Sequence, residues 1–168
     1  VHFSGLDTDT EKSYGASIPA ELALSGEKDV LLAFEMNGEP IPRDHGFPVR
    51  AVVPGVVGAR NVKWLGRVSL SDVESSSHWQ QRDYRGFPPN VDWEKVDWDS
   101  MPSIQELPVI SAIAGVDYDA QKKELLVKGY AYSGGGRSII RVDLTTNDGK
   151  EWRQARLQAK EETPHGRD

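Results

Sequence analysis

The sequence predicts an α+β fold that is mostly β, and three observations lead to this class. The 16 glycines and 10 prolines are spread along the chain, as expected for many short strands joined by turns. Short apolar runs recur, whereas only residues 17–24 are typical of a helix. The 168 residues, 38% hydrophobic and 27% charged, are enough for one domain or two small ones with a buried core.

Composition and charge exclude several classes of protein. The net charge of −6 argues against a nucleic-acid partner, which would require clustered Lys and Arg. No apolar run approaches the roughly 18 residues of a membrane-spanning helix, so we expect no membrane partner. The chain has no Cys, which excludes disulfides, thiolate zinc sites and thiol catalysis within it. Because it starts at Val1 without a charged-then-apolar leader, we expect either a removed leader or a start inside a larger protein.

The first half of the chain predicts one helix among several extended segments. Residues 17–24 form the predicted helix, with Ser17 as a possible cap and Pro19 in the first turn. Asn37-Gly38 is a strong signal for a tight turn after a strand. Residues 71–103, rich in Ser, Asp, Pro and Trp, predict an irregular segment that leads into a linker. The predicted extended segments are 30–35, 47–57 and 62–70.

From residue 107 the pattern changes to that of a β-sandwich. Leu125 and Val127 alternate with polar neighbours, so one face of the sheet is expected to be apolar and to need burial. A sandwich of this type needs about seven strands, but only four precede the polar tail 160–168. We therefore expect the sheet to lack its partner and to leave this apolar face uncovered. The four candidates, punctuated by turns at 133–136 and 147–150, are 109–115, 124–131, 138–145 and 151–157.

Two neighbouring segments carry the densest set of functional residue types. In residues 42–50, His45 and Arg50 are suited to phosphate or polar ligands, and Gly46 permits close approach. In residues 55–63, which include Arg60, the backbone amides of a Gly-rich basic segment could cradle an anion, and Lys63 would add charge. A surface loop with paired Arg and Asp, and a plain tight turn, are the simpler readings of these two segments.

Taken together, these residues indicate a family. The string PRDHGFPVRAVVPGVVGARNVKWLGRV resembles the molybdopterin-binding core of the sulfite oxidase family, and the flanking strings GLDTDTEKSYGASIP and SHWQQRDYRGFPPNVDWE resemble the same domain. PSIQELPVISAI resembles the entrance to the family's immunoglobulin-like dimerisation domain. The resemblance covers about residues 3–157. It implies the C-terminal part of a molybdopterin-binding oxidoreductase domain at 1–86, a linker at 87–104 and a truncated immunoglobulin-like dimerisation domain at 105–168.

The resemblance also implies roles for particular residues. Tyr84, with Asp83 beside it, matches the active-site tyrosine near the molybdenum, although an ordinary packed tyrosine is the alternative. Asp7 could equally be a turn residue. No metal ligand is assigned, because His2, His78 and His165 lack the spacing of a metal site. The residues that match cofactor-contacting positions are Asp7, His45, Arg50, Asn61, Val62 and Lys63.

The family reaction, as the resemblance implies it, is oxidation of sulfite to sulfate at a molybdopterin molybdenum cofactor. Electrons pass through a haem domain, which would precede Val1, to cytochrome c; a homodimer in the mitochondrial intermembrane space is also implied. The family's metal-bound Cys has no counterpart here, so we expect a fragment that is inactive alone. The alternatives are an inactive short product that acts as a dimerisation or interaction module and, more distantly, an assimilatory nitrate reductase, which shares the HGFPVR-type core.

Overall fold

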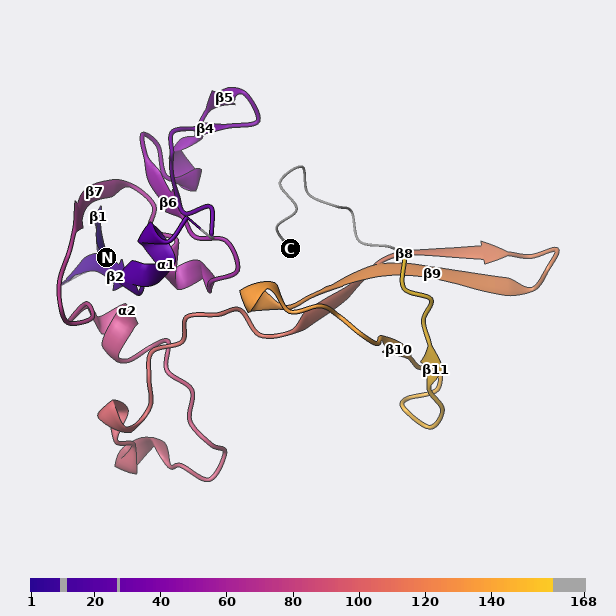
Figure 1. Ribbon diagram of the computed structural model, residues 1–168. Coiled ribbons are helices and arrows are strands. Elements are labelled where there is room, and N and C mark those ends of the chain that lie inside the picture. The colour runs from indigo at the N-terminus through magenta and orange to yellow at the C-terminus, as the bar shows by residue number, and fades with distance from the viewer. Residues whose placement is uncertain (10–11, 27, 159–168) are drawn as a thin grey trace. The chain divides into compact units, whose positions relative to one another are not determined.

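The computed structural model describes residues 1–9, 12–26 and 28–158, and it divides the chain into two units, Val1–Glu106 and Leu107–Asp168 (Figure 1). Its two α-helices, five and four residues long, are outweighed by strands, so the predicted mostly-β α+β class is confirmed. Within the described residues, no helix is both long and apolar enough to cross a membrane. The predicted tail 160–168, with His165, lies outside the described residues.

A three-stranded antiparallel sheet forms the base of the first unit. Its central strand β1 (His2–Thr8) lies between β2 (Ser13–Ser17) and β7 (Leu65–Ser69). Phe3 pairs with Ala16 on one side and with Val68 on the other, and both Phe3 and Ala16 are buried. β7 confirms a strand within the predicted 62–70 segment. It begins only at Leu65, because Trp64 has a positive φ of 47° that interrupts extended backbone.

The predicted helix is shorter than expected, and the proposed cap is wrong. Helix α1 (Ala20–Leu24) begins after Pro19, while Ser17 ends strand β2. The Ser17 amide donates to Gln80 Oε1 at 3.1 Å, and the Ser17 hydroxyl accepts from the Ser75 amide at 2.8 Å. Ser17 is thus held in a buried hydrogen-bond network instead of capping a helix.

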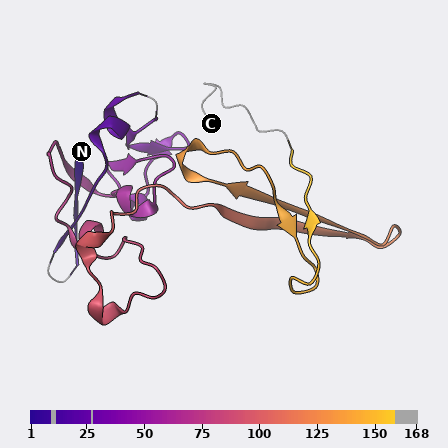
Figure 2. The same ribbon diagram turned by 60° about the horizontal axis from the view of Figure 1, so that its bottom comes forward.

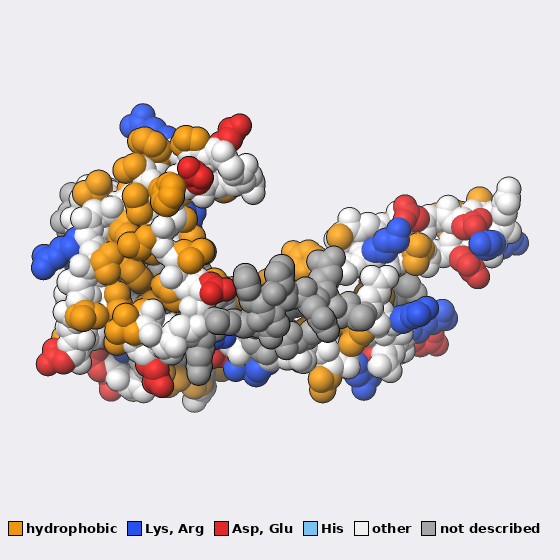
Figure 3. Space-filling view, turned by 45° about the horizontal axis from the view of Figure 1, so that its top comes forward, with side chains coloured by type: hydrophobic (Ala, Val, Ile, Leu, Met, Phe, Trp, Pro, Cys, Tyr) orange, Lys and Arg blue, Asp and Glu red, His pale blue; other side chains and the backbone are white. Residues whose placement is uncertain are grey.

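Two short antiparallel pairs complete the strands of the first unit. β3 (Leu31–Ala33) pairs with β6 (Arg50–Val52), and β4 (Glu35–Met36) pairs with β5 (Glu39–Pro40). The predicted Asn37-Gly38 turn joins β4 to β5, with φ of 56° and 82°, as a type I′ turn requires. Leu31 is 51% exposed, and Figure 3 shows hydrophobic side chains gathered over a face of this unit.

The segment predicted to be irregular contains only short helices. α2 (His78–Gln81) places Gln80 in the interior, where its side chain donates to Glu74 Oε2 and to Ser103 Oγ, each at 3.0 Å. Arg85 donates to Glu74 Oε1 at 2.6 Å from a nearly buried side chain. This polar network ties residues 74–103 to the sheet. The 3-10 helices of the unit are η1 (Arg43–His45), η2 (Gly58–Arg60), η3 (Trp93–Lys95) and η4 (Trp98–Ser100).

In its described part, residues 107–158, the second unit has two antiparallel strand pairs and one 3-10 helix, η5 (Gly134–Gly136), in agreement with an immunoglobulin-like β domain. β8 (Ile110–Asp119) and β9 (Glu124–Tyr132) form a long hairpin, which Figure 2 shows clearly. β10 (Asp143–Leu144) pairs with β11 (Arg153–Gln154). The strands predicted at 138–145 and 151–157 are therefore mostly wrong, because only two residues of each pair in a ladder.

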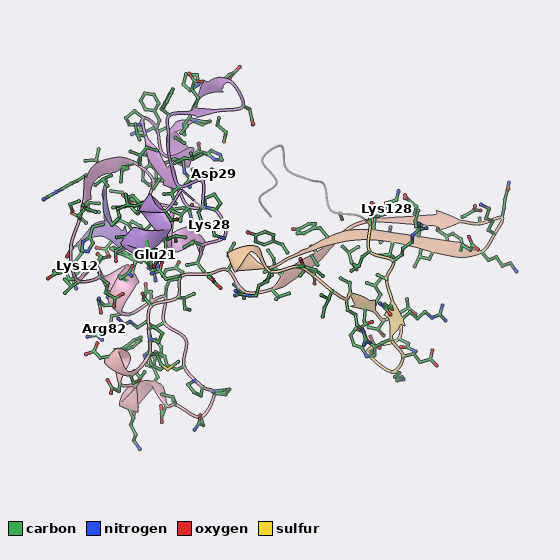
Figure 4. All side chains as sticks on the ribbon, viewed as in Figure 1. Lys12, Glu21, Lys28, Asp29, Arg82 and Lys128 are labelled. Atoms are coloured by element: carbon green, nitrogen blue, oxygen red, sulfur yellow. The ribbon has the colours of Figure 1, made fainter. Side chains whose placement is uncertain are left out.

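Many large apolar side chains of this unit are exposed. Leu125 is 52% exposed and Ile140 is 88% exposed, as expected for a sheet without a partner layer. Lys128, labelled in Figure 4, lies on β9, and its Nζ is 3.3 Å from the Asp117 carboxylate on β8. Both groups are exposed, so this ion pair adds little stability and does not replace a buried core.

Core packing in the first unit gives a first prediction. Val53 is 1% exposed, so Val53→Ala removes two buried methyl groups and should lower the free energy of unfolding by about 2 kcal/mol. Val73, 69% exposed, is the matched control, and Val73→Ala should change that free energy by less than about 0.5 kcal/mol. Denaturant titration followed by tryptophan fluorescence measures both. Equal effects of the two substitutions would contradict the core assignment.

The Glu74 network gives a second prediction. Burial by itself raises the pKa of Glu74. Hydrogen bonds from Gln80 and Ser103 and the charge of Arg85 lower the pKa by more than burial raises it, so the net pKa lies below the ordinary 4.5. This stabilisation is present above the ordinary pKa and is lost as pH falls through the folded-state value. Acid should therefore destabilise the wild type more steeply than Glu74→Gln. Glu35→Gln, on exposed β4, should keep the wild-type slope; an unchanged slope in Glu74→Gln would refute the network's role.

Candidate functional site

A pocket of about 290 Å³ in the first unit brings several predicted residues together. Asp7 comes from β1, Arg50 from the start of β6, and Lys63 from the segment before β7. Strands distant in the sequence therefore present one acidic and two basic side chains to the same pocket. The lining residues are Asp7, Tyr14, Arg50, Gly58, Asn61 and Lys63.

The two basic residues are held by backbone carbonyls. Arg50 donates from Nη1 to the His45 carbonyl at 3.0 Å and from Nη2 to the Asn61 carbonyl at 3.4 Å. Lys63 Nζ donates to the Asp44 carbonyl at 2.9 Å. Neutral carbonyls orient these cations without neutralising them, so both charges remain available to an anionic ligand.

Gly46 makes this arrangement possible. Its φ is 111°, a left-handed conformation that favours glycine. A Cβ at this position would lie 2.9 Å from the Lys63 Cβ and 3.2 Å from the Arg50 Cβ. The close approach that the sequence predicted at Gly46 is therefore between the chain and its own two basic residues.

Asp7 supplies an acceptor to the pocket. Its Oδ1 atom is buried and has no hydrogen-bond partner among the described residues. A buried carboxylate oxygen is normally paired, so an unpaired one beside a pocket is suited to accept N–H groups from a ligand. The pocket thus offers cations for a phosphate and an acceptor for a heterocycle, which fits a phosphate-tailed pterin.

The other residues predicted to contact the cofactor occupy different surroundings. Asn61 lines the pocket, but its side chain accepts from the Val53 amide at 2.6 Å and donates to the Val57 carbonyl at 3.2 Å. Val62 is fully buried in the core, and its carbonyl accepts from the Ala51 amide. His45 is exposed and takes part through its carbonyl. Their cofactor roles stay predictions.

Tyr84 and Asp83 do not line this pocket. Tyr84 is 40% exposed, and its ring centroid lies 5.7 Å from the Arg60 guanidinium carbon. The Asp83 carboxylate accepts a hydrogen bond from His78 Nε2 at 3.0 Å, at the surface. The catalytic role of Tyr84 stays a prediction.

Sequence reasoning missed Tyr14 and did not foresee that Arg60 is buried. Tyr14 lines the pocket, donates to the Ala59 carbonyl at 2.7 Å and packs on Trp79 with ring centroids 4.7 Å apart; burial raises its pKa. Its place in the string SYGASIP was the available signal. Arg60 is completely buried and bonds to carbonyls, so it does not add charge to an anion cradle.

Two family models and several known proteins match this chain. Residues 1–79 match the model of the oxidoreductase molybdopterin binding domain, and residues 101–168 match that of the Mo-co oxidoreductase dimerisation domain. The chain is 60% identical over 167 residues to the mitochondrial sulfite oxidase of Homo sapiens, covering 98% of this chain and 31% of that protein. The chain therefore spans about a third of the length of that relative.

More distant relatives are also similar. The chain is 40% identical over 173 residues to the NADPH nitrate reductase of Phytophthora infestans, covering 94% of this chain and 19% of that protein. Among solved structures, the sulfane dehydrogenase SoxCD from Paracoccus pantotrophus matches with a TM-score of 0.68 and 30% identity, covering 95% of this chain and 39% of that one. With both of its domains matched and 60% identity along nearly its whole length, the chain belongs to the sulfite oxidase family of molybdopterin-binding oxidoreductases.

Proposed function

We propose that this chain is part of a molybdenum-dependent enzyme that oxidises sulfite to sulfate. The pocket that joins Arg50, Lys63 and Asp7, whose Oδ1 has no partner among the described residues, carries the proposal, because it lies inside the segment that matches a molybdopterin-binding domain. The 60% identity to a sulfite oxidase, against 40% to a nitrate reductase, favours sulfite over nitrate as the substrate.

Each pocket residue has a part in holding the cofactor. Arg50 and Lys63 would bind its phosphate, Arg50 with two prongs and Lys63 as a point charge. Asp7 would accept N–H groups of the pterin, while Asn61 fixes the 53–57 turn that borders the pocket. His45 and Val62 contribute through the backbone. The bound molybdenum cofactor would supply transfer of an oxygen atom to sulfite and accept two electrons.

Tyr84 would serve the substrate instead of the pterin. Its phenol is exposed enough to reach a ligand, and a phenol O–H can donate to an oxyanion such as sulfite. The electrons would then leave through a haem domain to cytochrome c. Neither partner leaves a recognisable feature in these residues, and both follow from family membership.

The absence of a Cys thiolate in this chain supports the proposal that the chain is a fragment of the enzyme. A sulfite oxidase of this family binds its metal through a Cys, and this chain contains none. We propose that the metal ligand comes from a part of the protein outside these residues, and that the chain alone does not turn over sulfite. The domain limits 1–86, 87–104 and 105–168 remain part of this proposal.

The dimerisation-domain match supports a homodimer, and the mitochondrial relative supports a mitochondrial location; we propose the intermembrane space. The second candidate function is an inactive short product that acts as a dimerisation or interaction module. The exposed apolar strands of the second unit favour this candidate, because such surfaces mark contact sites.

The native mass separates these two candidates. An antibody against residues 40–65 should detect, in the source tissue, a polypeptide several-fold heavier than 18.6 kDa. That result, together with molybdenum-dependent sulfite oxidation by the heavy polypeptide, is expected. A native band at 18.6 kDa without bound molybdenum would refute the enzyme and leave the short module.

Cofactor binding gives a further prediction. Arg50→Gln in the native-length polypeptide should lower its molybdenum content at least about tenfold, because it removes a two-pronged phosphate contact. Arg67→Gln, at an exposed arginine on β7, is the matched control and should retain wild-type content. Metal analysis of the purified proteins measures both, without reliance on activity. Full molybdenum content in Arg50→Gln would contradict the assignment of this pocket.

A further inference from the structure

Arg60 is a completely buried arginine next to the pocket. It ends η2, directly before the pocket residue Asn61, and its exposed fraction is 0%. Burying a guanidinium is unfavourable unless its N–H groups are hydrogen-bonded, and burial lowers the pKa of Arg60. The hydrogen bonds that offset the cost of burying the guanidinium therefore show which segments Arg60 holds in place.

The guanidinium joins three segments that have no regular secondary structure in common. Its Nη1 donates to the Trp79 carbonyl at 2.8 Å, its Nη2 to the Tyr84 carbonyl at 3.4 Å, and its Nε to the Ile104 carbonyl at 3.1 Å. The Ile104 amide in turn donates to the Tyr84 carbonyl at 2.8 Å. The Tyr84 backbone is thus held from two sides.

The Tyr84 ring is held by the same group. The guanidinium carbon lies 5.7 Å from the ring centroid, within the range of a cation–π contact. Since the residue is 40% exposed, packing alone leaves the ring free on one side. On the pocket side, Tyr14 donates to the carbonyl of Ala59, the residue before Arg60. The pocket wall and the Tyr84 segment therefore share one anchor.

We propose that Arg60 is the positioning residue for Tyr84, and that it fixes the phenol relative to the cofactor pocket. The proposal rests on the proposed function, since it assigns Tyr84 to the substrate. This role requires the planar guanidinium of arginine with its several N–H donors, because a lysine ammonium cannot donate to three carbonyls in a fixed fork geometry. Arg60 itself touches neither cofactor nor substrate.

Hydrogen exchange tests the anchor without any activity. In the native-length protein, Arg60→Met should speed exchange of the Ile104 amide at least about tenfold, because its acceptor segment loses its anchor. The amides of β1, β2 and β7 should keep their wild-type rates. Arg82→Met is the matched control: Arg82, labelled in Figure 4, is exposed and lies 5.4 Å from the Trp98 ring centroid. Unchanged Ile104 exchange in Arg60→Met would overturn the proposal.

A double-mutant cycle tests whether the anchor acts through Tyr84. With molybdenum content normalised, Arg60→Met should lower kcat for sulfite about tenfold or more in the wild-type background. In the Tyr84→Phe background, which removes the hydroxyl that needs aiming, the same substitution should change kcat less than about twofold. Equal fold-losses in both backgrounds would show a merely structural role and overturn the proposal.

The conservative variant guards against a folding failure. Arg60→Lys keeps the charge without the fork, so it should fold and still show fast Ile104 exchange and a lowered kcat. Wild-type exchange and kcat in Arg60→Lys would overturn the proposal even if Arg60→Met does not fold. If the wild type itself does not oxidise sulfite, the proposed function fails, whereas the exchange experiment still decides whether Arg60 fixes the Tyr84 segment.

Discussion

The hydrogen bonding of one buried guanidinium organises the first unit. A charged group in the interior must have its donors satisfied, and Arg60 satisfies three of them with carbonyls from residues 79, 84 and 104. Two of these segments meet only in the isolated Arg85–Ser103 bridge, and the third lies in the short helix α2, so no extended strand ladder joins all three. The Arg60 side chain therefore helps to hold the irregular 71–106 segment in place through hydrogen bonds, as strand pairing holds β1, β2 and β7.

In the pocket, too, basic side chains donate to backbone carbonyls, but these side chains are less buried than Arg60. Arg50 and Lys63 are aimed by neutral carbonyls, so their charges remain for a ligand, and Gly46 allows their backbones to approach. Asp7 adds an acceptor, Oδ1, that no other described residue pairs with. A pocket with fixed cations and a waiting acceptor is matched to a polar, phosphate-bearing heterocycle. Its Tyr14 wall is linked through Ala59 to the Arg60 anchor, so in the proposed function cofactor binding and substrate positioning would have a common support.

The second unit has regular backbone pairing but few buried side chains. Its long hairpin β8–β9 has regular pairing, but side chains such as Leu125 and Tyr118 are more than half exposed. A hairpin of this kind is only marginally stable until another layer covers its apolar side. The match to a dimerisation domain agrees with such a surface, because a unit with exposed apolar strands gains its stability from contact with a further layer.

The sequence by itself determined the mostly-β class, the Asn37-Gly38 turn, the family and the residue types of the pocket. These depend on local backbone preference or on contiguous strings, and Asp7, Arg50, Asn61 and Lys63 indeed line one pocket. The tertiary structure alone decided that Ser17 ends a strand, that Tyr14 joins the pocket, and that Arg60 is an anchor. Their partners are backbone atoms and side chains up to 63 residues away, and a backbone carbonyl carries no sequence signature.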